Sequence, residues 1–219
     1  MCGRFTLNAP PELLAKTFAL QEHPQIEARY NIAPGQRVAA IRHVDDHNRL
    51  DFLKWGLIPH WSKEVTHTPI NARSETVHEK PTFSHALKHS RCVIPSTGFY
   101  EWVPTKDNRK QPYFIRLSNS GIMGFAGLWE GWTSEDGTEV ETCCILTTSA
   151  NEMMQPIHER MPVILQPDDY GLWMNRDFHD VHELQRLYQP YHSDLLVAHT
   201  VPDLVNNPRF DSHACIVQV

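Results

Sequence analysis

Residues 91–103 read RCVIPSTGFYEWV, a stretch with the composition of two short β-strands in succession. β-Branched and aromatic side chains predominate in it, and Gly98 separates residues 91–97 from residues 99–103. Strands of this kind carry side chains alternately on their two faces, so Glu101 is expected to point away from the face that presents Tyr100 and Trp102.

The same composition continues along most of the chain. Further strands are predicted over residues 38–43, 50–55, 113–117, 122–129, 142–148, 163–165 and 195–199. Helices are predicted over residues 10–20, 82–89, 150–154, 168–174 and 181–188. Strands outnumber helices and do not alternate with them as in βαβ proteins. The expectation is therefore a single α+β domain over residues 1–219, with a mainly antiparallel, barrel-like sheet and peripheral helices.

Length and composition exclude several classes of protein. A chain of 219 residues is long enough for one domain with a sizeable core. We find no apolar run that could cross a bilayer and no signal peptide, so a cytoplasmic protein without membrane contact is expected. The five cysteines form no C-x-x-C pair, which argues against a disulfide framework and a cysteine-rich zinc site.

Charge is distributed unevenly along the chain. The net charge of −6 by itself argues against a nucleic-acid partner. Residues 1–116, however, hold 16 Lys and Arg against 11 Asp and Glu, whereas residues 117–219 hold 4 against 15. This asymmetry permits one basic face on an acidic protein, although charge alone slightly favours a merely solvated acidic half.

Cys2 is placed for unusual chemistry if Met1 is removed, as expected before a small residue. The new terminus would carry an amine with a pKa of about 7.7–8.0 and a thiol with a pKa of about 8.5 on adjacent carbons. The amine can form a Schiff base with an aldehyde, and the thiol can then close a five-membered thiazolidine ring. Taken alone, Cys2 is better interpreted as a chance residue after the start codon.

Three further motifs hold polar groups suited to a site. Asn71 and Arg73 offer an amide and a phosphate-binding fork, although in isolation this stretch is better interpreted as a polar loop with a structural arginine. Glu101, in an aromatic strand, becomes an acid–base group if buried, and is otherwise an outward-facing carboxylate. His158 could move protons and Arg160 could bind phosphate, although a histidine in a chain with 14 of them is more often structural.

Seven blocks together resemble one known family. MCGRF, RYNIAPG, WGLIPHW, NARSET, RCVIPSTGFYEW, QPYF and IHERMPV occur in this order between residue 1 and about residue 165. They are similar to the blocks of the SOS response-associated peptidase (SRAP) family of abasic-site processing proteins. The resemblance implies a single SRAP-like domain that acts in DNA damage and the SOS response.

The resemblance also implies roles for individual residues. Cys2 would be the nucleophile, Asn71 would hold the cysteine and the sugar, Glu101 would position the amine and move protons, and His158 would assist ring opening and Schiff-base chemistry. Arg4, Arg73 and Arg160 would bind DNA phosphates. Looser correspondences make Asn31, Pro34, Trp61 and Trp102 contacts to DNA or wedges between its bases, as aromatic rings beside cations suit single strands.

The function expected on this basis is that of an abasic-site sensor. It would bind single-stranded DNA as a monomer, crosslink Cys2 covalently to the ring-opened sugar, and have a lyase-type activity at the Schiff-base stage. No cofactor is expected. No metal is expected either, because His23, His43, His47 and the other histidines show no ligand spacing.

Three alternatives remain open at this point. The first is an N-terminal cysteine hydrolase, a peptidase that acts on peptides or only on its own Met1 through Cys2, Glu101 and His158. The second is a non-enzymatic module that binds single-stranded DNA. The third is a structural or interaction protein, which would be favoured if these residues lay far apart.

Overall fold

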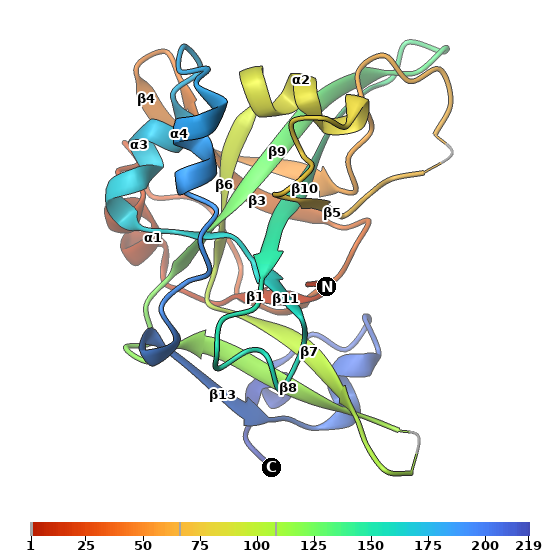
Figure 1. Ribbon diagram of the computed structural model, residues 1–219, viewed down its shortest axis with the longest axis vertical. Helices are drawn as coiled ribbons and strands as arrows, with labels where there is room; N and C mark the ends of the chain where they lie inside the picture. The colour runs from red at the N-terminus through yellow and green to blue at the C-terminus, as the bar shows by residue number, and fades with distance from the viewer. Residues whose placement is uncertain (1, 66, 108) are drawn as a thin grey trace.

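The computed structural model describes residues 2–65, 67–107 and 109–219 of the chain (Figure 1). The strands are β1 Phe5–Leu7, β2 Arg29–Ile32, β3 Arg37–Val44, β4 His47–Trp55, β5 Asn71–Arg73, β6 Arg91–Ser96, β7 Gly98–Pro104, β8 Lys110–Leu117, β9 Met123–Thr133, β10 Glu139–Ser149, β11 Arg160–Pro162, β12 Ile164–Leu165 and β13 Leu196–Thr200. The α-helices are α1 Pro11–Thr17, α2 Pro81–His89, α3 Tyr170–Met174 and α4 Val181–Arg186.

Five strands close into a barrel. They pair in the order β10-β4-β3-β6-β9, and β9 pairs with β10 to complete the ring. The β4–β10 pair is parallel and the other pairs of the ring are antiparallel. Closure pairs the backbone N–H and C=O groups at the edges of β9 and β10 with each other. The predicted α+β class with a mainly antiparallel, barrel-like sheet is thereby confirmed.

A second, antiparallel sheet lies below the barrel in Figure 1, with the strand order β13-β8-β7-β1-β2. The stretch 91–103 joins the two units, because β6 belongs to the barrel and β7 to the sheet. β1 also joins them. It pairs with β7 and β2, while the ring of Phe5 packs edge-on against Trp55 at 5.1 Å and Phe125 at 6.1 Å.

The helices lie at the periphery, as predicted (Figure 1). One prediction was wrong: residues 150–154 form no helix, and turns occupy residues 152–157. The side chain of Asn151 accepts a hydrogen bond from the Met154 N–H at 2.9 Å, and Pro156 supplies no N–H for a helical bond. Among the described residues, no helix is both long and apolar enough to span a membrane.

The sequence analysis missed four short strands, β1, β2, β5 and β11. Each has only three or four residues, too few to display the alternation that identifies a strand. These strands carry or adjoin several of the candidate site residues.

Side-chain and backbone atoms of β8 pack directly against Gly98, and we predict that Gly98→Ala destabilises the protein. A Cβ there would overlap the buried ring of Phe114 and lie 2.9 Å from the carbonyl oxygen of Ile115. We expect a loss of about 1–3 kcal/mol in the free energy of unfolding, measured by urea denaturation. Gly131→Ala is the control, since its Cβ would meet nothing within 4 Å. Equal stability of the two variants would contradict the prediction.

Candidate functional site

Cys2 is held inside the protein at the junction of barrel and sheet. Its side chain is fully buried, and its carbonyl oxygen accepts a 2.9 Å hydrogen bond from Asn71 Nδ2. The next anchor along the chain is the carbonyl oxygen of Arg4, which accepts from the N–H of Tyr100 at 3.0 Å. β5, which pairs with β10 of the barrel, thus brings Asn71 to the residue that the sequence analysis singled out as nucleophile.

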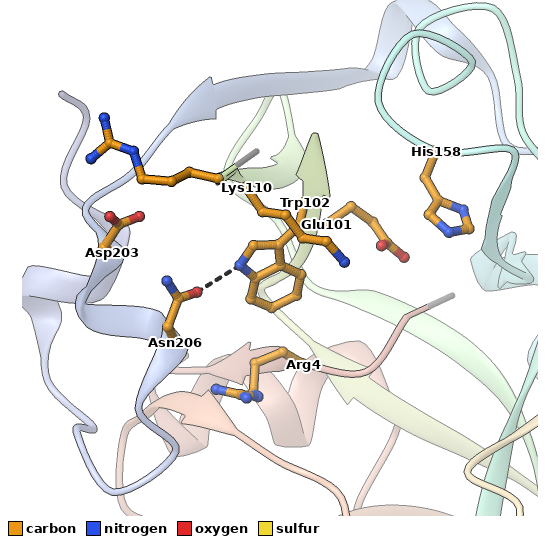
Figure 2. Close-up of a pocket in the computed structure, with 8 residues that line it drawn as sticks. Arg4, Glu101, Trp102, Lys110, His158, Asp203 and Asn206 are labelled. Carbon is orange, nitrogen blue, oxygen red and sulfur yellow. Dashed lines mark hydrogen bonds between the residues drawn. The ribbon is translucent and has the colours of Figure 1, made fainter. Parts of the chain in front are cut away.

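Glu101 and His158 face each other beside this point (Figure 2). Glu101 lies on β7 with its side chain buried, directed away from Trp102 as the strand alternation predicts. His158 lies in the segment that leads into β11. Its Nδ1 accepts a 2.9 Å hydrogen bond from the N–H of Arg160, which leaves the proton of the neutral ring on Nε2.

Burial sets the protonation of these groups. It raises the pKa of Glu101 to about 7 and lowers the pKa of His158. It also raises the pKa of the Cys2 thiol far above its usual range, and the neighbouring Glu101 carboxylate adds to this shift. At neutral pH the thiol is therefore protonated, while Glu101 can both accept and donate a proton.

An open cavity of about 620 Å³ adjoins the pair (Figure 2). It is lined by Arg4, Glu101, Trp102, Arg109, Lys110, His158, Asp203 and Asn206. Three of these residues are cationic, and Trp102 offers an indole ring fixed by a 2.7 Å hydrogen bond from Nε1 to Asn206 Oδ1. Glu101 and Asp203 are the acidic members of the lining, so cationic groups exceed acidic ones by one, which favours an anionic ligand with flat rings.

Four lining residues escaped the sequence analysis: Arg109, Lys110, Asp203 and Asn206. Arg109 and Lys110 lie near the end of the basic half of the chain, and Lys110 is its last lysine. That position in the charge distribution is the sequence feature that could have indicated them. Asp203 and Asn206 belong to a 3₁₀-helix, residues Asp203–Asn206, that is distant in sequence from every motif.

Of the predicted DNA contacts, Arg4 and Trp102 line the cavity. Pro34, Trp61 and Arg73 are exposed at other positions, and Trp61 has 56% of its surface accessible. Contact of these five residues with DNA stays a prediction.

The prediction for Asn31 requires a correction. Its side chain has no exposed surface: Oδ1 accepts from Arg4 at 2.7 Å, and Nδ2 donates to the carbonyl oxygens of Val205, Asn207 and Phe210. Asn31 thus fastens the C-terminal segment to β2 instead of presenting itself to a ligand.

Arg160 is also directed inward. Its guanidinium forms two hydrogen bonds to the carboxylate of Glu75, at 2.5 and 2.9 Å, and one to the carbonyl oxygen of Thr147 at 2.6 Å. Its side chain is 11% exposed. This ion pair links β11 to the segment after β5, and the role of Arg160 in phosphate binding stays a prediction. The expected removal of Met1 concerns a residue outside the described ones.

The fold and the site define an α+β barrel protein whose candidate catalytic groups gather around an N-proximal cysteine. A profile of the SOS response associated peptidase (SRAP) family matches residues 1–208, and the chain belongs to this family.

Individual relatives agree with this assignment. The chain is 41% identical over 217 residues to the abasic site processing protein YoqW of Bacillus subtilis, with 97% of each chain covered. It is 28% identical over 268 residues to the abasic site processing protein HMCES of Rattus norvegicus, covering 99% of this chain and 75% of the relative. A crystal structure of a Bacteroides thetaiotaomicron protein superimposes with a TM-score of 0.88 at 26% identity, with both chains covered completely.

The raised pKa of Glu101 predicts a pH-dependent stability difference between wild type and Glu101→Gln. In the unfolded chain this carboxyl ionises near the ordinary glutamate pKa of 4.5, and in the folded protein its pKa is about 7. The protonated Glu101 carboxyl therefore contributes to the free energy of unfolding fully below pH 4.5, and this contribution is lost as the pH rises through 7. Relative to Glu101→Gln, wild type should lose on the order of 3 kcal/mol between these pH values.

Urea denaturation of both proteins from about pH 4.5 to about pH 8 measures this difference. Parallel stability curves for wild type and Glu101→Gln would show that the Glu101 carboxyl ionises alike in the folded and unfolded states.

Proposed function

We propose that this protein processes abasic sites in single-stranded DNA by linking the ring-opened sugar covalently to Cys2. The observation that carries the proposal is the placement of Cys2, fixed by Asn71, beside two proton-transfer groups that line a basic cavity. The names of the relatives, abasic site processing proteins, supply the substrate class.

The reaction begins once Met1 has been removed and the α-amine belongs to Cys2. Glu101, with a pKa of about 7, takes a proton from the ammonium group, and the amine attacks the C1′ aldehyde carbon. His158 assists in protonating the oxygen, which leaves as water and gives an imine. The Cys2 sulfur then adds to the imine carbon while its proton passes to the nitrogen, so that aldehyde and aminothiol give thiazolidine and one water.

The imine stage also accounts for a lyase-type activity. Loss of a C2′ proton from the imine would break the bond from C3′ to its phosphate and cleave the strand. Capture of the imine by the thiol competes with this step, because the Cys2 sulfur is bonded to Cβ, adjacent to the Cα that carries the amine.

The cavity supplies the DNA contacts in this proposal. Arg4, Arg109 and Lys110 offer positive charge for phosphates, and Trp102 offers a ring for stacking. A single strand suits the site because its neighbouring nucleotides are unpaired, so the abasic sugar can enter without opening a duplex. One copy of the chain provides all these groups, so the protein is proposed to act as a monomer.

Removal of Met1 by the protein itself is the second candidate activity. It is favoured by the same placement of Glu101 and His158 beside Cys2, since a peptide bond needs a nucleophile and a proton donor for the leaving amine. Removal of Met1 would then come first and crosslinking to the abasic sugar second, and both would use Cys2, Glu101 and His158.

The crosslink is predicted to depend on Cys2. Wild type incubated with a labelled single-stranded oligonucleotide containing one abasic site should give a heat-stable shifted band on a denaturing gel. Cys2→Ala should give none, and Glu101→Gln should form the band about 10²–10⁴-fold more slowly, because a general acid–base group contributes a factor of this size.

Cys92→Ala is the matched control, because Cys92 is likewise fully buried but lies in β6 of the barrel. It should crosslink as wild type does. An oligonucleotide without the abasic site and a protein with a retained N-terminal extension should give no band. A band of full strength from Cys2→Ala would overturn the proposal.

Loss of Met1 is predicted to be intramolecular. Protein that keeps Met1 can be prepared in cells with methionine aminopeptidase inhibited. It should then lose Met1 in a first-order process, at a rate independent of protein concentration. Mass spectrometry follows the loss, and Glu101→Gln should retain Met1. Equal rates for wild type and Glu101→Gln would assign the removal to an external peptidase.

A further inference from the structure

Two histidines and a buried carboxylate meet where the barrel contacts α2. His60 lies in the loop after β4, His85 in α2 and Glu130 in β9. His60 Nδ1 is 3.1 Å from one carboxylate oxygen of Glu130, and His85 Nδ1 is 2.9 Å from the other. The three residues come from separate elements and none belongs to the site around Cys2.

Glu130 is the unusual member of this cluster. Its side chain is 5% exposed, and within residues 2–65, 67–107 and 109–219 its ion pairs are with His60 and His85. Burying a carboxylate is costly unless a positive charge offsets it. A neutral imidazole offers only a hydrogen bond, whereas a cation between the three side chains would neutralise the charge directly.

The positions of the donor atoms suit a metal ion. The two imidazole nitrogens and a carboxylate oxygen all lie within 4.8 Å of one another. Ligand atoms about 2.0–2.2 Å from a tetrahedral zinc ion are roughly 3.5 Å apart, so the two nitrogen–oxygen distances of 2.9 and 3.1 Å would have to lengthen slightly. Imidazole nitrogen favours first-row transition ions, whereas Mg²⁺ and Ca²⁺ prefer oxygen ligands alone.

We propose that His60, His85 and Glu130 form a binding site for a divalent transition-metal ion of the Zn²⁺ type. The side chains of His60 and His85 are 43% and 47% exposed, so an ion can enter from solvent and water can complete its coordination. His89 extends the row of imidazoles, with its ring 5.0 Å from that of His85. It offers a further nitrogen one turn along α2.

Metal binding would fasten the loop after β4 to the barrel. The loop is already attached at Ser62, whose carbonyl oxygen accepts a 2.7 Å hydrogen bond from Trp132 Nε1. An ion on His60 would strengthen the attachment that His60 already has to Glu130, on the other side of Trp61, the exposed ring that the sequence analysis associated with DNA. The bound ion therefore stabilises the folded protein and restricts the backbone at Trp61.

The test uses full-length protein without an affinity tag, in the Cys2→Ala background so that this thiol cannot contribute. Titration with Zn²⁺ against a chromophoric chelator should show one equivalent bound. At about 100 times the dissociation constant, Zn²⁺ should raise the melting temperature by roughly 5–10 °C. Co²⁺ should give the visible absorption bands of a four-coordinate ion with nitrogen and oxygen ligands.

His60→Ala and His85→Ala should abolish the bound equivalent, the thermal shift and the Co²⁺ bands. Both residues are half exposed, so these variants are expected to fold, which circular dichroism checks. His43→Ala, a substitution of an exposed histidine on β3, is the control and should bind as the parent does. Absence of binding at micromolar Zn²⁺, or equal binding by His60→Ala and the parent, would overturn the proposal.

Discussion

The wedging of β1 between β2 and β7 is the constraint on which the site depends. Phe5 lies in the core against Trp55 and Phe125, and its backbone pairs with both neighbouring strands. Three residues of chain reach at most about 10 Å, so Cys2 must stay close to this anchor. Because β7 is one of the two partners of β1, Glu101 is carried to the same place by the same pairing.

Burial then determines what the site can do. In a polar surface loop, Cys2 and Glu101 would ionise near their ordinary pKa values. Inside the protein the thiol stays protonated, and the pKa of the carboxyl rises to about 7, where it can exchange protons in both directions. The same burial makes the ionised carboxylate a cost to folding, so the chemistry and the stability of this region are opposed.

Some charged residues of the basic and acidic halves form ion pairs with each other within the folded protein. The acidic half pairs with the basic half through Arg29 and Asp211 and through Arg42 and Glu141, and the Arg42 side chain is only 7% exposed. The acidic half is therefore more than a solvated surface. The C-terminal segment held by Asn31 also contributes Asp203 and Asn206 to the cavity wall.

The sequence by itself determined the long strands, because β-branched and aromatic runs such as residues 91–103 identify themselves locally. It also singled out Cys2 and Glu101 as candidates through the resemblance of the seven blocks to the SRAP family, because residue type and immediate neighbours alone left both roles open. Only the tertiary structure decided the closure of the barrel, the short strands β1, β2, β5 and β11, and the inward orientation of Asn31 and Arg160. It alone assembled His60, His85 and Glu130, since 25 and 45 residues separate them. These features arise from long-range pairing, and no local pattern in the chain encodes them.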